Sequence, residues 1–218
     1  MNLHLLQLGD SALPIGGYSH SWGLEAAIER GRVRDAVGLE AWTRLYLREV
    51  LGPLDAVVVG AVVRSSTCMA TANQLLRASI APPTLRLASR DMGEQLLSLA
   101  ATWEWGSEVV ADIRACGATP CQHAVAFGAL AAAAGASACD AVTLFLHQAA
   151  LGVISAGVRG VPIGHTHGQQ ILARLHNDIA YLAEKLYDRP LETAGSNCPA
   201  YEILCHDQSQ LYTRIFRS

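Results

Sequence analysis

Two histidines in a glycine-flanked stretch, His165 and His167 in "GHTHG", are the residues of this sequence best suited to bind a metal ion. Imidazole is a good ligand for nickel, zinc and copper. A closed site, however, needs three or four protein ligands. The other candidate ligands are isolated in the sequence: His123, His147, His176, His206, Cys198 and Cys205. We therefore favour two partly exposed histidines in an interhelical turn and keep a metal site at His165 and His167 as the alternative.

Signatures of nucleotide binding and of nucleophilic catalysis are missing from the sequence. It contains no GxxxxGK[ST] phosphate-binding loop, and no GxGxxG segment follows a strand pattern. No GxSxG element that would present a nucleophilic serine is found either. The sequence therefore predicts a protein that is not an enzyme, with a small hydrolase using the two histidines as a weaker hypothesis.

An unusual loop lies near the N-terminus, in "SALPIGGYSHSWGLEAAIE", residues 11–29. Connecting loops are usually small and polar, whereas this one holds Tyr18, His20 and Trp22. We expect Tyr18 and His20 to be displayed to a partner, and Trp22 to anchor the loop to the core. The adjacent Gly16 and Gly17 favour a tight turn over an anion site.

Composition limits the class of protein. The chain has 218 residues, of which 51% are hydrophobic and 16% charged, and its net charge is −3. This predicts a single domain of closely packed helices over residues 1–218, and it gives no electrostatic basis for binding nucleic acid. The N-terminus lacks the pattern of a secretory signal, so we expect a cytoplasmic protein. The six scattered cysteines are read as free thiols.

The main alternative to this reading is a membrane span within residues 115–158, where Asp140 is the only charged side chain. The first apolar run there is mostly alanine and glycine, which transfer weakly into lipid. The second run holds His147 and Gln148 at its middle, where lipid would penalise them. We therefore expect no membrane partner, but a buried helical hairpin with a tightly packed small-residue face that includes Ala132.

Apolar periodicity predicts helices nearly everywhere, and no segment alternates like a strand. We expect an all-α bundle of roughly eight to ten helices. The expected ranges are 3–9, 19 or 21 to 30, 35–51, 54–66, 83–103, the hairpin within 115–158, and 169–187. Gly52 and Pro53 are read as a break between two of these helices. The composition after Pro190 predicts a poorly ordered tail or a C-terminal arm, residues 190–218, that orders on a partner.

Three segments, taken together, resemble the urease accessory protein UreF family. They are "LLQLGDSALPIGGYSHSWGLEAAIERGRV", then "HAVAFGALAAAAG" continuing to "SAGVRGVPIGHTHGQQIL", and finally "HDQSQLYTRIFRS". Their order and spacing match the family over almost the whole chain. Two positions depart from the family pattern: His165 stands where glutamine is common, and Asp207 replaces glutamate.

The resemblance implies an all-helical, non-catalytic homodimer. Proteins of this family lie between a UreD/UreH-type protein bound to apo-urease and the GTPase UreG, and the complex directs nickel into urease. We therefore expect a scaffold with no cofactor other than nickel in transit. The alternative is a nickel-binding metallochaperone that uses His165 and His167.

Partner-binding residues are predicted in the three matching segments. Arg159 ends an uncharged helix, where the macrodipole favours a cation; the functional alternative is contact with the GTPase or its nucleotide. Arg214 could make bidentate bonds to a partner's carboxylate, or could pair with Glu202 or Asp207 in its own chain. The full set predicted to contact partners is Tyr18, His20, Glu25, Arg159, Gln169, Tyr212, Arg214 and Phe216.

Overall fold

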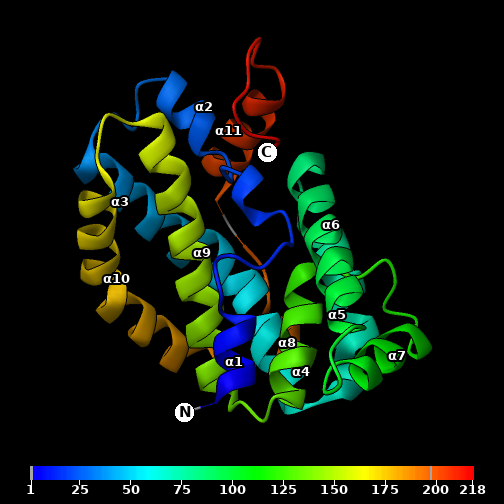
Figure 1. The fold of residues 1–218 in the computed structure, drawn as a ribbon. Coiled ribbons are helices and arrows are strands. Elements are labelled where there is room, and N and C mark those ends of the chain that lie inside the picture. The colour runs from blue at the N-terminus through cyan, green and yellow to red at the C-terminus, as the bar shows by residue number, and fades with distance from the viewer. Residues whose placement is uncertain (1, 197) are drawn as a thin grey trace.

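A computed structural model describes residues 2–196 and 198–218, and these residues form helices and no strand (Figure 1). The all-α prediction is confirmed. The α-helices are α1 (Leu3–Leu8), α2 (Leu24–Glu29), α3 (Ala36–Leu45), α4 (Val57–Arg64), α5 (Met69–Ser79), α6 (Pro83–Ala100), α7 (Ser107–Ala115), α8 (His123–Ala133), α9 (Ala138–Gly160), α10 (His165–Leu186) and α11 (Pro199–Ser209). The π-helical segment η2 (Tyr46–Ala56) joins α3 to α4, and short 3₁₀ turns are η1 (Gly17–Ser19), η3 (Ser66–Cys68) and η4 (Leu191–Thr193).

Helix α9 runs through the length of the molecule, with α3 and α10 on one side and α4 and α8 on the other (Figure 1). By length and apolar composition it could cross a membrane, but half of its most apolar stretch is buried inside the protein. Buried residues such as Phe145, Leu146 and Val153 belong to one continuous hydrophobic core. Helices α8 and α9 occupy the range predicted for the helical hairpin. They do not pack mainly on each other, because α8 packs mainly on α4 and α6, and α9 mainly on α10 and α4.

Glycines allow helices to touch backbones in this core. A Cβ on Gly60 of α4 would collide with the Tyr187 carbonyl, and one on Gly93 of α6 would collide with the backbone at Cys121 and Gln122. A Cβ on Gly128 of α8 would lie 3.2 Å from the Val59 carbonyl oxygen. Ala132, which the sequence predicted on the tight face, is instead half-buried beside a surface groove.

The predicted break at Gly52 and Pro53 is wrong, because residues 36–64 form one continuous helical path. Pro53 has no N–H to donate, and the π-helical turn around it accommodates the missing hydrogen bond. The structure also contains α5 and α7, which the periodicity did not identify, and it starts α2 at Leu24 rather than at residue 19 or 21.

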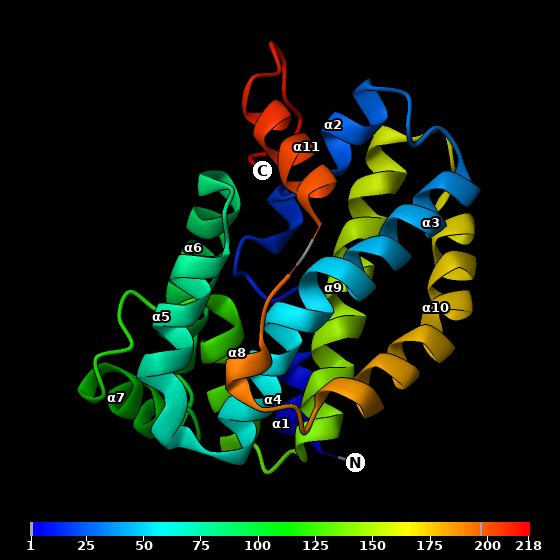
Figure 2. The same cartoon turned by 180° about the vertical axis from the view of Figure 1, so that it is seen from behind.

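The C-terminal part differs most from expectation. Instead of a poorly ordered arm, residues after Pro190 form η4 and α11. The Gly195 N–H donates to the Pro53 carbonyl at 2.9 Å, which fixes the connecting segment to η2. Figure 2 shows the chain rising from η4 along the back of the molecule, and α11 lies between α6 and α2. Buried Tyr201, Leu204 and Cys205 on α11 join the core, so the helix is part of the fold.

Candidate functional site

The C-terminal segment returns to the N-terminal loop and binds it through the backbone. The Ser218 carbonyl accepts hydrogen bonds from the N–H groups of Ser21 and Trp22, and the Arg217 N–H donates to the Ser19 carbonyl at 2.8 Å. We call this region, residues 16–25 with Arg159 and residues 214–218, the terminal junction. It joins two segments that the sequence places almost a full chain length apart.

Glu25 is the polar centre of the terminal junction. Its carboxylate accepts hydrogen bonds from the backbone N–H groups of Ile215 at 2.6 Å and Phe216 at 3.2 Å. The buried Gln208 side chain on α11 donates to the Ser21 hydroxyl at 2.9 Å and approaches Glu25 at 3.5 Å. A negative charge bonded to two backbone donors holds the returning segment in one orientation.

His20 lies inside the junction rather than on its surface. Only 6% of the residue is exposed, and its Nδ1 is 2.6 Å from the Ser218 hydroxyl. Burial, and then the charge of Arg217, lower the pKa of His20, so the imidazole is neutral at pH 7. Its predicted contact with a partner would therefore require the junction to open.

Arg159 binds α9 to both segments of the junction. Its guanidinium donates to the Tyr18 carbonyl at 2.7 Å and to the Ser155 carbonyl at 3.2 Å. It also lies 4.5 Å from the centre of the Phe216 ring, within the range of a cation–π contact. Phe216, predicted to meet a partner, is buried in this contact. The arginine thus has a structural role that the helix dipole alone did not predict.

Several apolar side chains around the junction face solvent. Tyr18 is 75% exposed, Ile215 71%, and Tyr212 fully exposed. Arg214 is exposed as well. The predicted alternative pair of Arg214 with Asp207 is not formed among the described residues, because Asp207 pairs with Arg30 at 2.7 Å.

The backbone of the N-terminal loop is held in a demanding conformation. Trp22 has a φ of 55°, a left-handed value that costs a residue with a Cβ about 1–2 kcal/mol. Its ring packs on Tyr46, with the centroids 6.4 Å apart, and on the edge of the core. The predicted anchoring role of Trp22 is confirmed. Gly16, with a φ of 84°, forms the expected tight turn.

A mostly apolar cavity of about 280 Å³ lies beneath the junction. Its walls include Trp22, Tyr46 and Tyr201, together with Asp55 and His123. Burial raises the pKa of Asp55 to about 7 and lowers the pKa of His123 to about 4. Both side chains are therefore held toward their neutral forms, as expected for half-buried titratable groups in a mostly apolar cavity.

The predicted metal candidates do not form a cluster. His165 and His167 lie in the first turn of α10, not in an interhelical turn, and residues two apart on a helix point in different directions. Within the described residues, no group of three or more His, Cys, Asp or Glu side chains is placed to hold a metal ion. Gln169 is exposed one turn further along α10.

Three further residues, which were not predicted from the sequence, support the junction: Ser21 and Ser218 lie within it, and Gln208 binds it from α11. Their signal was weak because serine and glutamine are ordinary surface residues. On α11, however, Gln208 continues the helical spacing of the buried Tyr201 and Leu204. A polar residue at a position where the helical spacing predicts a buried apolar one is the pattern that could have identified Gln208.

Comparison with known proteins connects this arrangement to one family. A family model described as UreF matches residues 33–176. The chain is 33% identical to the "Urease accessory protein UreF" of Cereibacter sphaeroides, over 99% of this chain and 98% of the relative. It is 32% identical to the protein of that name from Cupriavidus taiwanensis, over 99% and 97%, and 31% identical to that from a Nostoc species, over 99% and 95%.

Proposed function

The chain belongs to the urease accessory protein UreF family, and we propose on this basis that it is a non-catalytic scaffold for urease maturation. It bridges a UreD/UreH-type protein on apo-urease and a UreG-type GTPase while nickel is delivered. Nickel is the cargo of the assembly rather than a resident cofactor of this chain. We further propose that the scaffold is a homodimer that acts in the cytoplasm.

The observation that supports this proposal best is the terminal junction. Tyr18 and Ile215 are exposed side chains on backbone that is fixed by hydrogen bonds to Arg159 and Glu25, and the exposed Tyr212 precedes Ile215 in the same C-terminal segment. Aromatic and apolar side chains held in advance in one orientation contribute strongly to binding, because little conformational entropy remains to be lost. The junction is therefore the surface that we assign to the UreD/UreH-type partner.

The metallochaperone alternative has less support. His165 and His167 lie on one helical turn without a third ligand among the described residues. Nothing in the geometry around them favours nickel binding over simple exposure at the start of α10. The scaffold is therefore the function that we propose.

Capture of the UreD/UreH-type partner by the purified chain tests this function. The double variant Tyr212→Ala with Ile215→Ala removes two exposed side chains that support no other part of the fold, so its melting temperature should stay within about 2 °C of wild type. Its affinity for the partner should fall at least about tenfold, as expected for central apolar contacts.

Tyr181→Ala on α10 is the matched control, because Tyr181 is also a largely exposed tyrosine, at 56%. It should bind the partner like wild type. Equal affinity of the double variant and this control would refute the assignment of the surface. Absence of any capture by the wild-type chain would refute the scaffold itself.

A further inference from the structure

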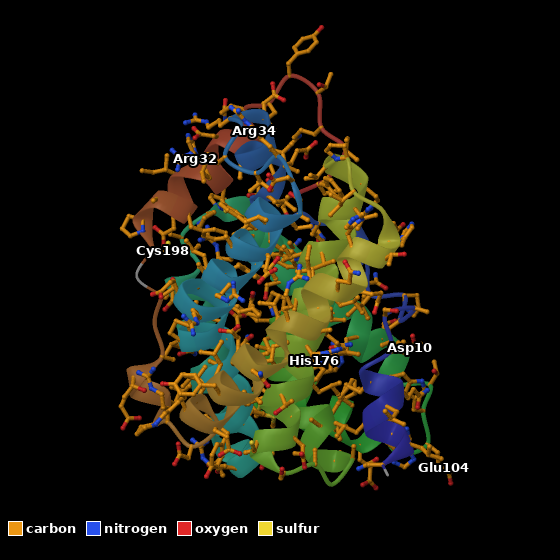
Figure 3. The ribbon with its side chains drawn as sticks, turned by 90° about the vertical axis from the view of Figure 1, so that its left-hand side faces the viewer. Asp10, Arg32, Arg34, Glu104, His176 and Cys198 are labelled. Atoms are coloured by element: carbon orange, nitrogen blue, oxygen red, sulfur yellow. The ribbon has the colours of Figure 1, made fainter. Side chains whose placement is uncertain are left out.

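The fold brings together two histidines that are isolated in the sequence. His147 lies at the middle of α9 and His176 at the middle of α10, and the centroids of their rings are 6.0 Å apart with an interplanar angle of 35°. Figure 3 shows His176 on α10 beside α9. Because α9 and α10 are the most extensively paired helices of the molecule, this separation is fixed by the packing of two long elements.

The neighbouring charges are engaged elsewhere. Arg174 pairs with Glu40 at 2.6 Å, and Asp178 pairs with Arg44 at 3.1 Å, both across to α3. His176 lies between these two residues in sequence and therefore points away from α3. Among the described hydrogen bonds, none joins either imidazole to the rest of the protein.

Both rings are accessible from outside the core. His176 is exposed and His147 half-buried. Neither ring is engaged by a described hydrogen bond, so the lone pair of a neutral imidazole is free to bind a metal ion.

We propose that His147 and His176 form an open two-histidine site for a late first-row divalent ion such as Zn²⁺ or Ni²⁺. Imidazole nitrogens bind such ions at about 2.0–2.1 Å, so two rings that share one ion have centroids about 5–6 Å apart. The observed centroid separation of 6.0 Å lies at the upper end of this range. The site is independent of the scaffold role, since it needs no protein partner.

The ligand chemistry defines which ions the site accepts. Two neutral nitrogen donors suit zinc, nickel and copper, whereas Mg²⁺ and Ca²⁺ prefer oxygen ligands. With only two protein ligands, the remaining coordination positions belong to water or to a donor from another molecule. Such a site releases its ion readily, in contrast to a closed structural site.

Calorimetric titration of the full chain with Zn²⁺, and separately with Mg²⁺, tests this proposal. We expect saturable Zn²⁺ binding and no Mg²⁺ binding. Mutation of a residue that only hydrogen-bonds to a metal ligand weakens metal binding about 10–100-fold. His176→Gln removes a ligand itself, so it should weaken zinc binding at least about tenfold. His147→Gln should have the same effect, and circular dichroism checks that each variant is folded.

The control is the double variant His165→Gln with His167→Gln, which removes two exposed histidines from the same helix. Its zinc affinity should stay within about twofold of wild type. This change is smaller than the change caused by loss of a residue that only supports a metal ligand. His176 is exposed, so its variant provides a test even if His147→Gln fails to fold. Zinc binding that survives His176→Gln, binding lost in the control, or no saturable binding at all would each overturn the proposal.

Discussion

The helical core and the terminal junction hold their parts together by different means. In the core, α8 packs on α4 and α6, α9 packs on α4 and α10, and backbones touch where Gly60 meets Tyr187 and Gly93 meets Cys121. In the junction, one carboxylate, one guanidinium and a set of backbone hydrogen bonds join segments 198 positions apart. The core depends on close backbone packing that leaves no room for added atoms, whereas the junction depends on hydrogen bonds that water can replace. We therefore expect substitutions in the core to lower the free energy of unfolding most. Substitutions in the junction should mainly change the surface that contacts a partner.

The largest expected effect is at the closest backbone contact of the core. Gly93→Ala would place a methyl group against the Cys121 and Gln122 backbone, which cannot move without displacing α8. We expect the free energy of unfolding to fall by more than about 3 kcal/mol. Chemical denaturation measures this loss.

Gly152→Ala on α9 is the control for that measurement, because a Cβ there has no neighbour within 4 Å. Better helix propensity should raise stability by up to about 1 kcal/mol. Similar responses of the two variants would show that backbone contact does not govern the core.

A second prediction concerns Asp55, in the cavity between the two regions. Its pKa is about 7 in the folded chain, against an ordinary value of 3.8, so the unfolded chain ionises first and wild-type stability falls as pH rises from about 4 to 7. Asp55→Asn should remove this loss. The variant should match wild type near pH 4 and exceed it by roughly 3 kcal/mol at pH 8.

Melting curves of both proteins across this pH range test the effect. The contribution of His123, whose lowered pKa acts in the opposite direction between about pH 6.5 and 4, cancels because both proteins contain it. A constant difference between variant and wild type at all pH values would contradict the assigned pKa.

The third prediction addresses the polar centre of the junction. Glu25→Gln keeps the shape of the side chain but removes the charge that accepts from Ile215 and Phe216. We expect a loss of about 1–2 kcal/mol. We also expect faster amide exchange at residues 214–218, with little change in α8 and α9, as measured by hydrogen exchange. Amide exchange that becomes faster by the same factor throughout the chain would mean that the junction and the core unfold together.

The smallest expected effect on stability is at Arg159. Arg159→Ala removes the hydrogen bond to Tyr18 and the contact with Phe216, at a cost of about 1 kcal/mol. Arg159→Lys is the matched control, because it keeps the cation at the end of α9 but loses the fork-shaped donor. Urease activation that fails in Arg159→Ala with normal stability would assign this residue to partner contact, and wild-type activation would assign it to the junction alone.

The sequence predicted the core better than the junction because the two depend on different information. Helices α9 and α10 follow from local periodicity, and α6 begins at the predicted proline. The continuous path through Pro53 could not be predicted, because proline ordinarily ends or kinks a helix and π-helical turns are rare. The roles of Glu25 and Phe216 depend on a pairing between distant segments, which no local pattern encodes. The proximity of His147 and His176 could not be predicted for the same reason.

The pairing of residues 19–22 with residues 217 and 218 also constrains the order of events during synthesis. At about 5–20 residues per second, the N-terminal loop waits about 10–40 s for its partner segment to be translated. During this interval Trp22 has no C-terminal segment to hold its left-handed backbone. The junction therefore closes only after residues 217 and 218 have been made, later than the contacts among the helices that precede them can form.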